Sequence, residues 1–135
     1  MDIYEATQKL LQEAVPEGVN VTYYLLTYDE QTDQFTLPAF PAVTYLYADN
    51  VPFSVQGGVT NLYNVTLDVE CWGELETVST VAETIIENIS AKRVTVGNVV
   101  FTMTVRESRD IYDMGLNYHH RLIRFGGVVD IGETE

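Results

Sequence analysis

The stretch that decides the fold is NLYNVTLDVECWG, residues 61–73. Apolar side chains alternate with polar ones along most of it, and the apolar set is Tyr63, Val65, Leu67, Val69 and Cys71. Because successive side chains of a β-strand point to opposite faces, one face of this strand is expected to be buried and the other to face water. Such a strand is typical of an antiparallel sheet that is covered on one side only.

Two amphipathic helices are expected to provide the cover. The first runs from Ile3 to about Ala14, with Asp2 as its N-cap and a Pro-Glu-Gly stop at residues 16–18. The second runs over about residues 77–91, where apolar residues recur at spacings of three and four. Each helix therefore has one apolar stripe that can pack against a sheet.

Further strands are expected over residues 19–25, 43–47, 99–106 and 118–125, with turns or loops at 29–34, 49–58 and 106–115. The order of elements is helix, strands, helix, strands. This order predicts a single α+β domain over residues 1–135. Its expected architecture is a two-layer sandwich, in which two α-helices pack on one face of an antiparallel or mixed β-sheet of about four to six strands.

The pattern leaves the register of the last strand open. The residues that face inward are either Tyr118, His120 and Leu122 or Arg121, Ile123 and Phe125. A bulge near His119 is one way to combine the two sets. The glycine pair at 126–127 and the acidic end of the chain are expected to fray.

Charge is distributed unevenly along the chain. Twenty acidic and seven basic residues give a net charge of −13. Residues 1–91 hold fourteen of the acids and one base, Lys9, whereas residues 92–135 hold six of each. Such a surface repels phosphate, so tight nonspecific binding of nucleic acid is not expected. An acidic surface favours solubility, and it also suits a wall past which a polyanion slides without sticking.

The sequence also indicates the cellular compartment in which the chain folds. No run approaches the ~18 uncharged apolar residues of a membrane span, so no membrane partner is expected. The acidic start, Met1-Asp2-Ile3, lacks the build of a secretory signal, and Cys71 has no second cysteine with which to form an intrachain disulfide. The chain is therefore expected to fold in a cytoplasm.

The candidate chemical groups favour structural roles. His119 and His120 are neighbours on an expected strand, so they point to opposite faces and do not easily bind one metal ion. Cys71 lies on an apolar strand face, where a thiol acts as a small core residue rather than as a nucleophile. No catalytic residue, cofactor or metal ion is expected.

Contacts between subunits are the more promising role for two groups of residues. The basic group can pair with acidic surface of the same subunit or of a neighbour, and a head-to-tail contact of this kind closes into a ring or runs on as a filament. Its members are Arg106, Arg109, Arg121 and Arg124. The apolar group either projects as a patch for a partner subunit or folds back over the sheet. Its members are Phe35, Leu37, Phe40, Val51 and Phe53.

Several segments occur together in an order and spacing that is moderately specific. They are an N-terminal helix that ends at a Pro-Gly stop, PAVTY at 41–45, the strand 61–73 with an amphipathic helix directly after it, and RESRDIYD at 106–113 leading to YHHRLIRF at 118–125. Over nearly its whole length the chain thus resembles the tail completion, or tail terminator, proteins of long-tailed, siphovirus-like bacteriophages.

The resemblance implies a virion structural protein without catalytic residues, assembled in the host cytoplasm. Members of this family form a ring, typically of six subunits, at the head-proximal end of the tail tube. The ring stops tube growth and provides the surface that joins tail to head. Its expected partners are further copies of the chain, the tail tube protein and a head–neck connector protein. DNA passes through such a ring without specific binding, and Asp29, Glu30 and Asp33 are candidates for acids that face the channel.

Two alternatives remain. The first is another neck component, such as a head–tail joining protein. The second belongs to a different class: a small cytoplasmic ligand-binding or hydrolytic α+β domain that uses His120 and a carboxylate. A deep pocket that holds His120 beside an acid with a strongly shifted pKa favours this reading, and a flat surface with exposed apolar loops counts against it.

Overall fold

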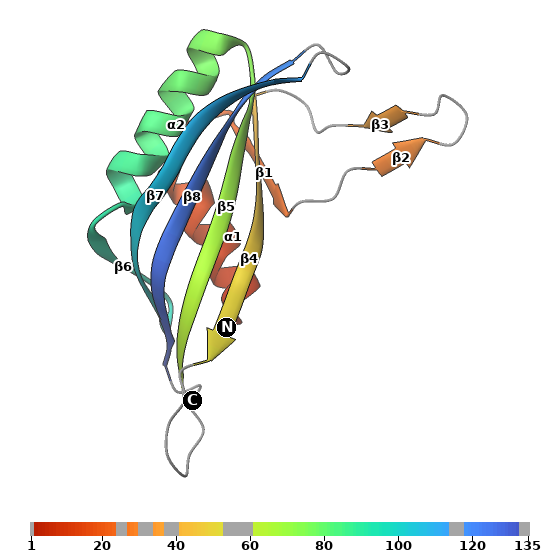
Figure 1. Ribbon diagram of the computed structural model, residues 1–135. Helices are drawn as coiled ribbons and strands as arrows, with labels where there is room; N and C mark the ends of the chain where they lie inside the picture. Colours follow the sequence, from red (N-terminus) through yellow and green to blue (C-terminus); the bar gives the residue numbers. More distant parts are fainter. Residues whose placement is uncertain are drawn as a thin grey trace.

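The computed structural model describes residues 2–23, 27–29, 34–36, 41–52, 61–113 and 118–132. Two helices, α1 (Ile3–Ala14) and α2 (Leu75–Ile89), pack on one face of a six-stranded sheet (Figure 1). The strands lie in the order β1-β4-β5-β8-β7-β6. Their bounds are β1 Asn20–Tyr23, β4 Ala42–Pro52, β5 Leu62–Gly73, β6 Lys92–Val96, β7 Val99–Asp113 and β8 Tyr118–Ile131.

The sheet is mixed. β1 runs parallel to β4, and the other neighbours in the sheet are antiparallel. Two short strands, β2 (Thr27–Asp29) and β3 (Gln34–Thr36), pair with each other and lie beyond the β1–β4 side of the sheet (Figure 1). The expected α+β class, the two layers and the two helices on one face are confirmed.

Helix α1 begins where the sequence predicts. The Asp2 carboxylate accepts a hydrogen bond of 2.8 Å from the backbone N–H of Glu5, which satisfies one of the free donors of the first turn. Gln8 then ties the helix to the sheet, because its amide donates to the carbonyl of Val21 and its oxygen accepts from the Tyr45 hydroxyl, both at 2.7 Å. The helix is thus held to β1 and β4 by polar as well as apolar contacts.

The core lies between the helices and the helix-facing side of β5 and its neighbours. Val65, Leu67, Val69 and Cys71 of β5 are buried there, as their alternation predicts. The helix α2 buries a stripe of five residues against them: Val78, Val81, Ala82, Ile85 and Ile89. β8 contributes Ile123, Phe125 and Val129, which settles the register of this strand in favour of the second set.

Two expectations about loops were wrong. β4 continues to Pro52 after a bulge between Tyr47 and Asp49, where a loop was expected. β7 continues through the charged segment to Asp113, with a bulge between Val105 and Glu107 rather than near His119. The cause is the same in both cases: a neighbouring strand supplies hydrogen bonds to the backbone, and pairing of this kind does not depend on alternating apolar side chains.

The glycines at 126–127 do not fray but lie inside β8, paired with β5 and β7. Residues 92–96, for which no strand was expected, form β6. A Cβ on Gly127 would overlap the carbonyl oxygen of Thr102 and lie 2.8 Å from the Cα of Met103, both in the backbone of β7. A Cβ on Gly126 would meet only the flexible side chain of Arg106, with its Nε at 2.6 Å.

We expect Gly127→Ala to lower the free energy of unfolding by about 1–3 kcal/mol, because the backbone of β7 must move to admit the new methyl group. Gly126→Ala is the matched control, and we expect a smaller loss because the Arg106 side chain can swing away. Urea unfolding of both variants measures the difference. Equal losses at the two positions would contradict the close approach of β8 to β7.

Candidate functional site: the open face and free edges of the sheet

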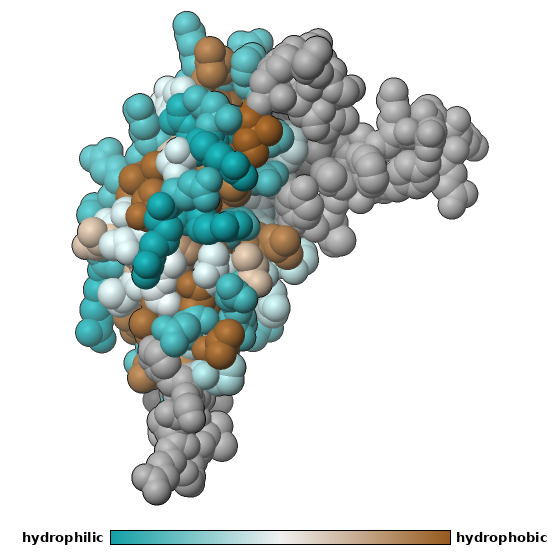
Figure 2. Space-filling model, in the orientation of Figure 1, coloured by the Kyte–Doolittle hydropathy of each residue, from teal (hydrophilic) through white to brown (hydrophobic). Residues whose placement is uncertain are grey.

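The open face, which is the side of the sheet turned away from the helices, faces the viewer in Figures 1 and 2. At one end of it four side chains are buried against one another: Thr44, Trp72, His120 and Leu122. The indole N–H of Trp72 donates to the Thr44 hydroxyl at 2.9 Å, and the Trp72 and His120 ring centroids lie 4.1 Å apart. This end of the face is a packed cluster rather than a cavity.

Charged side chains cross the middle of the open face. The Arg124 guanidinium donates twice to the Asp68 carboxylate, at 2.7 and 3.0 Å, from β8 to the facing position of β5. This two-point contact raises the pKa of Arg124 above its ordinary value. Arg109 pairs with Glu107 at 3.2 Å along the exposed end of β7. Two of the four predicted interface arginines are therefore engaged within the chain on this face.

Arg121 lies on the opposite, helix-covered side. Its guanidinium donates to Asp110 at 2.8 and 3.3 Å and reaches the Ser79 hydroxyl of α2 at 3.5 Å. The hydrogen bond from Arg121 holds the pKa of the Asp110 carboxyl below its usual range. The four arginines, grouped together by sequence, thus lie on two faces of the sheet.

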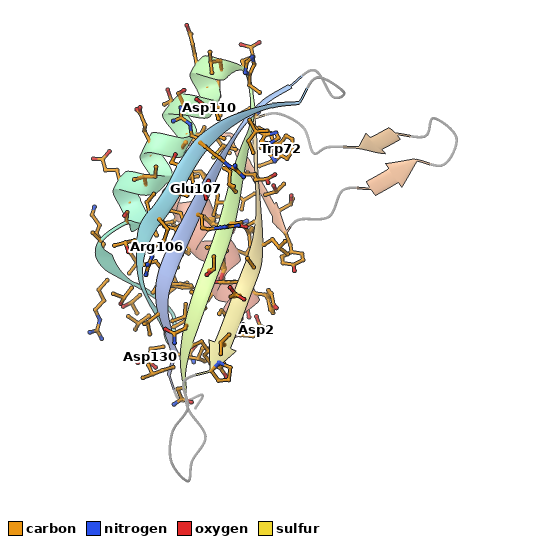
Figure 3. The ribbon with its side chains drawn as sticks, viewed as in Figure 1. Asp2, Trp72, Arg106, Glu107, Asp110 and Asp130 are labelled. Atoms are coloured by element: carbon orange, nitrogen blue, oxygen red, sulfur yellow. The ribbon has the colours of Figure 1, made fainter. Side chains whose placement is uncertain are left out.

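Arg106 occupies the bulge of β7, and its side chain lies across Gly126 of β8 (Figure 3). A bulge redirects a side chain, and the missing side chain of Gly126 leaves room for it. A pocket of about 390 Å³ opens beside it, lined by Asn64, Thr66, Arg106, Arg124 and the two glycines among others. Among the described residues no carboxylate forms an ion pair with Arg106.

The structure describes only some of the other residues that were predicted to lie at the subunit interface or in the channel. Val51 lies on β4 and is 54% exposed. Asp29 and Phe35 lie in β2 and β3. Leu37, Phe40, Phe53, Glu30 and Asp33 fall outside the described residues, so the projecting apolar patch and the acidic channel wall stay predictions.

The side chains considered as possible catalytic or metal-binding groups all lie on strands of the sheet. Cys71 is 1% exposed, and burial raises the pKa of its thiol to about 12. His119 and His120 pair with Gly73 and Trp72, successive residues of β5, and so point to opposite faces. Burial, and then the charge of Asp68, raises the pKa of Glu70. Within the described part of the chain no group of three metal-ligating side chains lies together.

On each side of the sheet the outermost strand is shorter than the strand next to it, so part of the longer strand's outer edge is left uncovered. We call this arrangement a step. β1 pairs with β4 only over Ala42–Tyr45, which leaves the outer edge of β4 beyond Leu46 without a neighbour among the described strands. β6 pairs with β7 only over Val99–Met103, and beyond it the outer edge of β7 is likewise free within the described residues from 106 to 113. A free strand edge presents unpaired backbone N–H and C=O groups that can hydrogen-bond to another chain. Sequence reasoning missed these edges, because no strand was expected over residues 92–96 and a turn or loop was expected over residues 106–115.

Comparison with protein-family models and with curated proteins finds no match to this chain. Among the described residues, neither helix has the length and apolar character that a membrane crossing requires.

We expect Glu70→Gln to raise the melting temperature at pH 7. Because the pKa of Glu70 is higher in the folded than in the unfolded chain, its ionisation removes stability as pH rises from the ordinary value of 4.5 through the raised folded value. Glutamine does not ionise, so the gain should be present at pH 7 and absent below about pH 4. Thermal melts of both proteins at the two pH values measure it.

The control is Glu87→Gln, which changes an exposed side chain of α2. A gain at Glu70 that is equally large at low pH would mean that packing rather than charge burial is the cause.

Proposed function

We propose that the chain is a structural subunit of a long-tailed phage that forms a ring at the head-proximal end of the tail tube, stops tube growth and provides the surface to which the head attaches. The observation that carries the proposal is the pair of free edges on opposite sides of one sheet. A subunit with a binding edge on each side joins one copy on its left and another on its right. Repeated head-to-tail contacts of this kind form a ring when the rotation from copy to copy closes, and a filament when it does not.

The charge supports passage of DNA through such a ring. With twenty acids against seven bases, the subunit repels a polyanion rather than retaining it. Three of the five described arginines, Arg109, Arg121 and Arg124, each pair with a carboxylate of the same chain, which reduces the positive charge that a polyanion meets. Asp29, Glu30 and Asp33 remain our candidates for the acids that line the channel.

Arg121 and Arg124 pair within the chain, so we propose an indirect part in assembly for them rather than a direct subunit contact. Arg121 holds Asp110 of β7, and Arg124 joins β8 to β5. Each contact thus joins two neighbouring strands of the sheet. A neck component that joins head and tail is the second candidate, because a ring with an acidic channel serves that role too. The two differ in whether the ring caps a growing tube.

The ring is tested by native mass spectrometry and negative-stain electron microscopy of the purified chain over a wide concentration range. We expect one closed oligomer, of six subunits, and ring-shaped particles with a central hole. A monomer at every concentration, or open filaments only, would contradict the proposal.

Capping is tested by adding the oligomer to polymerising tail tube protein of the same phage. A terminator bound at one tube end should shorten the tubes in proportion to the amount added. Rings that leave tube length unchanged would favour the head–tail joining role instead.

A further inference from the structure

We infer that the two stepped sides of the sheet are complementary and join copies of this chain side by side. In this arrangement β1 of one copy lies along the free edge of β7 of the next, and β6 of that next copy lies along the free edge of β4 of the first. The inference rests on the proposed function and specifies the surface by which the ring forms.

The contact between β1 and the neighbour's β7, the upper joint, follows from strand register. We call the residues that face one another across neighbouring strands a row, and the rows that include β1 the upper rows. One such row runs Val21–Val43–Cys71–Arg121–Asp110, from β1 to β7. The four rows of this kind begin at residues 20–23 of β1 and end at residues 111–108 of β7. The outer edge of β1 is therefore level with four residues of β7 whose own outer edge is free among the described strands.

The contact between β4 and the neighbour's β6, the lower joint, follows from the rows that include β6, which we call the lower rows. One runs Val51–Asn64–Val128–Thr102–Arg93, from β4 to β6. Three rows of this kind begin at Asn50, Val51 and Pro52 and end at Lys92, Arg93 and Val94. The free edge of β4 is thus level with the outer edge of β6.

Both joints form at the same separation between copies. The upper rows contain five strands, β1 to β7, and the lower rows contain five, β4 to β6. A neighbour that continues the sheet by five strand spacings, about 24 Å along its curved surface, and is rotated with the twist of the sheet therefore meets both steps together. With unequal rows one joint would overlap before the other could close.

Strand directions are compatible with both joints. β1 is parallel to β4, and β4 is antiparallel to β7 through β5 and β8, so β1 meets the β7 of a level neighbour in the antiparallel sense. By the same reasoning β4 meets β6 in the parallel sense. Both are regular modes of strand pairing.

Charge at the lower joint is complementary. Lys92 and Arg93 are exposed at the start of β6, and no described carboxylate forms an ion pair with either. Asp49 is exposed on β4, two residues from Val51 on the same face and hence diagonal to Arg93 of the neighbour. Charges on an edge usually prevent pairing with other chains. At the lower joint the edge of β4 is acidic and the edge of β6 is basic. This favours pairing of β4 with β6 over pairing of β4 with β4 or of β6 with β6.

Cross-linking tests the upper joint. Thr22 and Arg109 are both exposed, both lie on the open face and occupy the two ends of one row. We expect the double variant Thr22→Cys/Arg109→Cys, treated with a short bis-maleimide, to give a ladder of covalent oligomers that ends at the closed species. Mixing the two single variants should give only dimers that contain one of each. The native Cys71 does not interfere, because it is buried and its thiol pKa is raised to about 12.

The matched control is Thr22→Cys/Arg93→Cys, which uses the same two sides of the sheet at levels seven residues apart along the strands. We expect at least ten-fold less cross-linking from it. Should the first variant fail to fold, as judged by circular dichroism, Val51→Cys/Arg93→Cys tests the lower joint in the same way.

The outcomes separate the two proposals. A closed oligomer without cross-links between residues 22 and 109 would overturn the edge contact and leave the ring proposal standing. Cross-linked open chains that never close would support the edge contact and contradict the ring. A protein that neither assembles nor cross-links would contradict both.

Discussion

Strand β5 is the constraint on which the rest of the structure depends. It pairs along nearly its whole length with β4 on one side and β8 on the other, while its apolar face packs under the two helices. Its neighbours are equally long, but the outermost strands are short: β1 has four residues and β6 has five. Because each short strand covers only one end of its longer neighbour, both sides of the sheet end in a step. The free edges are thus a direct consequence of strand length.

Polar contacts on the open face join the strands of this central sheet to one another. Arg124 spans β8 and β5, and the Trp72–Thr44 hydrogen bond spans β5 and β4. His120, the one residue that an enzymatic reading required, is packed on the indole of Trp72 and is 7% exposed. The pocket beside Gly126 lies six residues away from it along β8.

The sequence predicts correctly those helices and strands that have a pattern in their own residues. The alternation at 61–73 predicts β5 and its buried face, and the Asp2 cap predicts the start of α1. It failed where pairing with a distant strand decides the structure. Ser108, Arg109 and Asp110 look like a loop, yet they pair with β8. The glycines at 126–127 look like a turn, yet they let β8 approach the backbone of β7 and accommodate Arg106.

The candidate site was predictable only in part, for the same reason. The basic residues were recognised as contact groups, but which carboxylate each one meets depends on strand register. Arg121 and Arg124 are three residues apart in sequence and point to opposite faces of the sheet. The stepped edges have no sequence signature of their own, because they follow from the relative lengths and offsets of six strands. The roles of Phe35, Leu37, Phe40 and Phe53 in subunit contacts stay predictions.

Hydrogen–deuterium exchange of the backbone amides tests the central claim most directly. The claim is that the free edge of β7 is completed by another copy of the chain. Exchange is compared between a dilute, dissociated sample and a concentrated, assembled one. The account predicts that those amides of residues 108–111 that point away from β8 slow at least ten-fold on assembly, while those of the exposed side of α2 do not change. Assembly that protects α2 and leaves 108–111 at the dilute rate would contradict it.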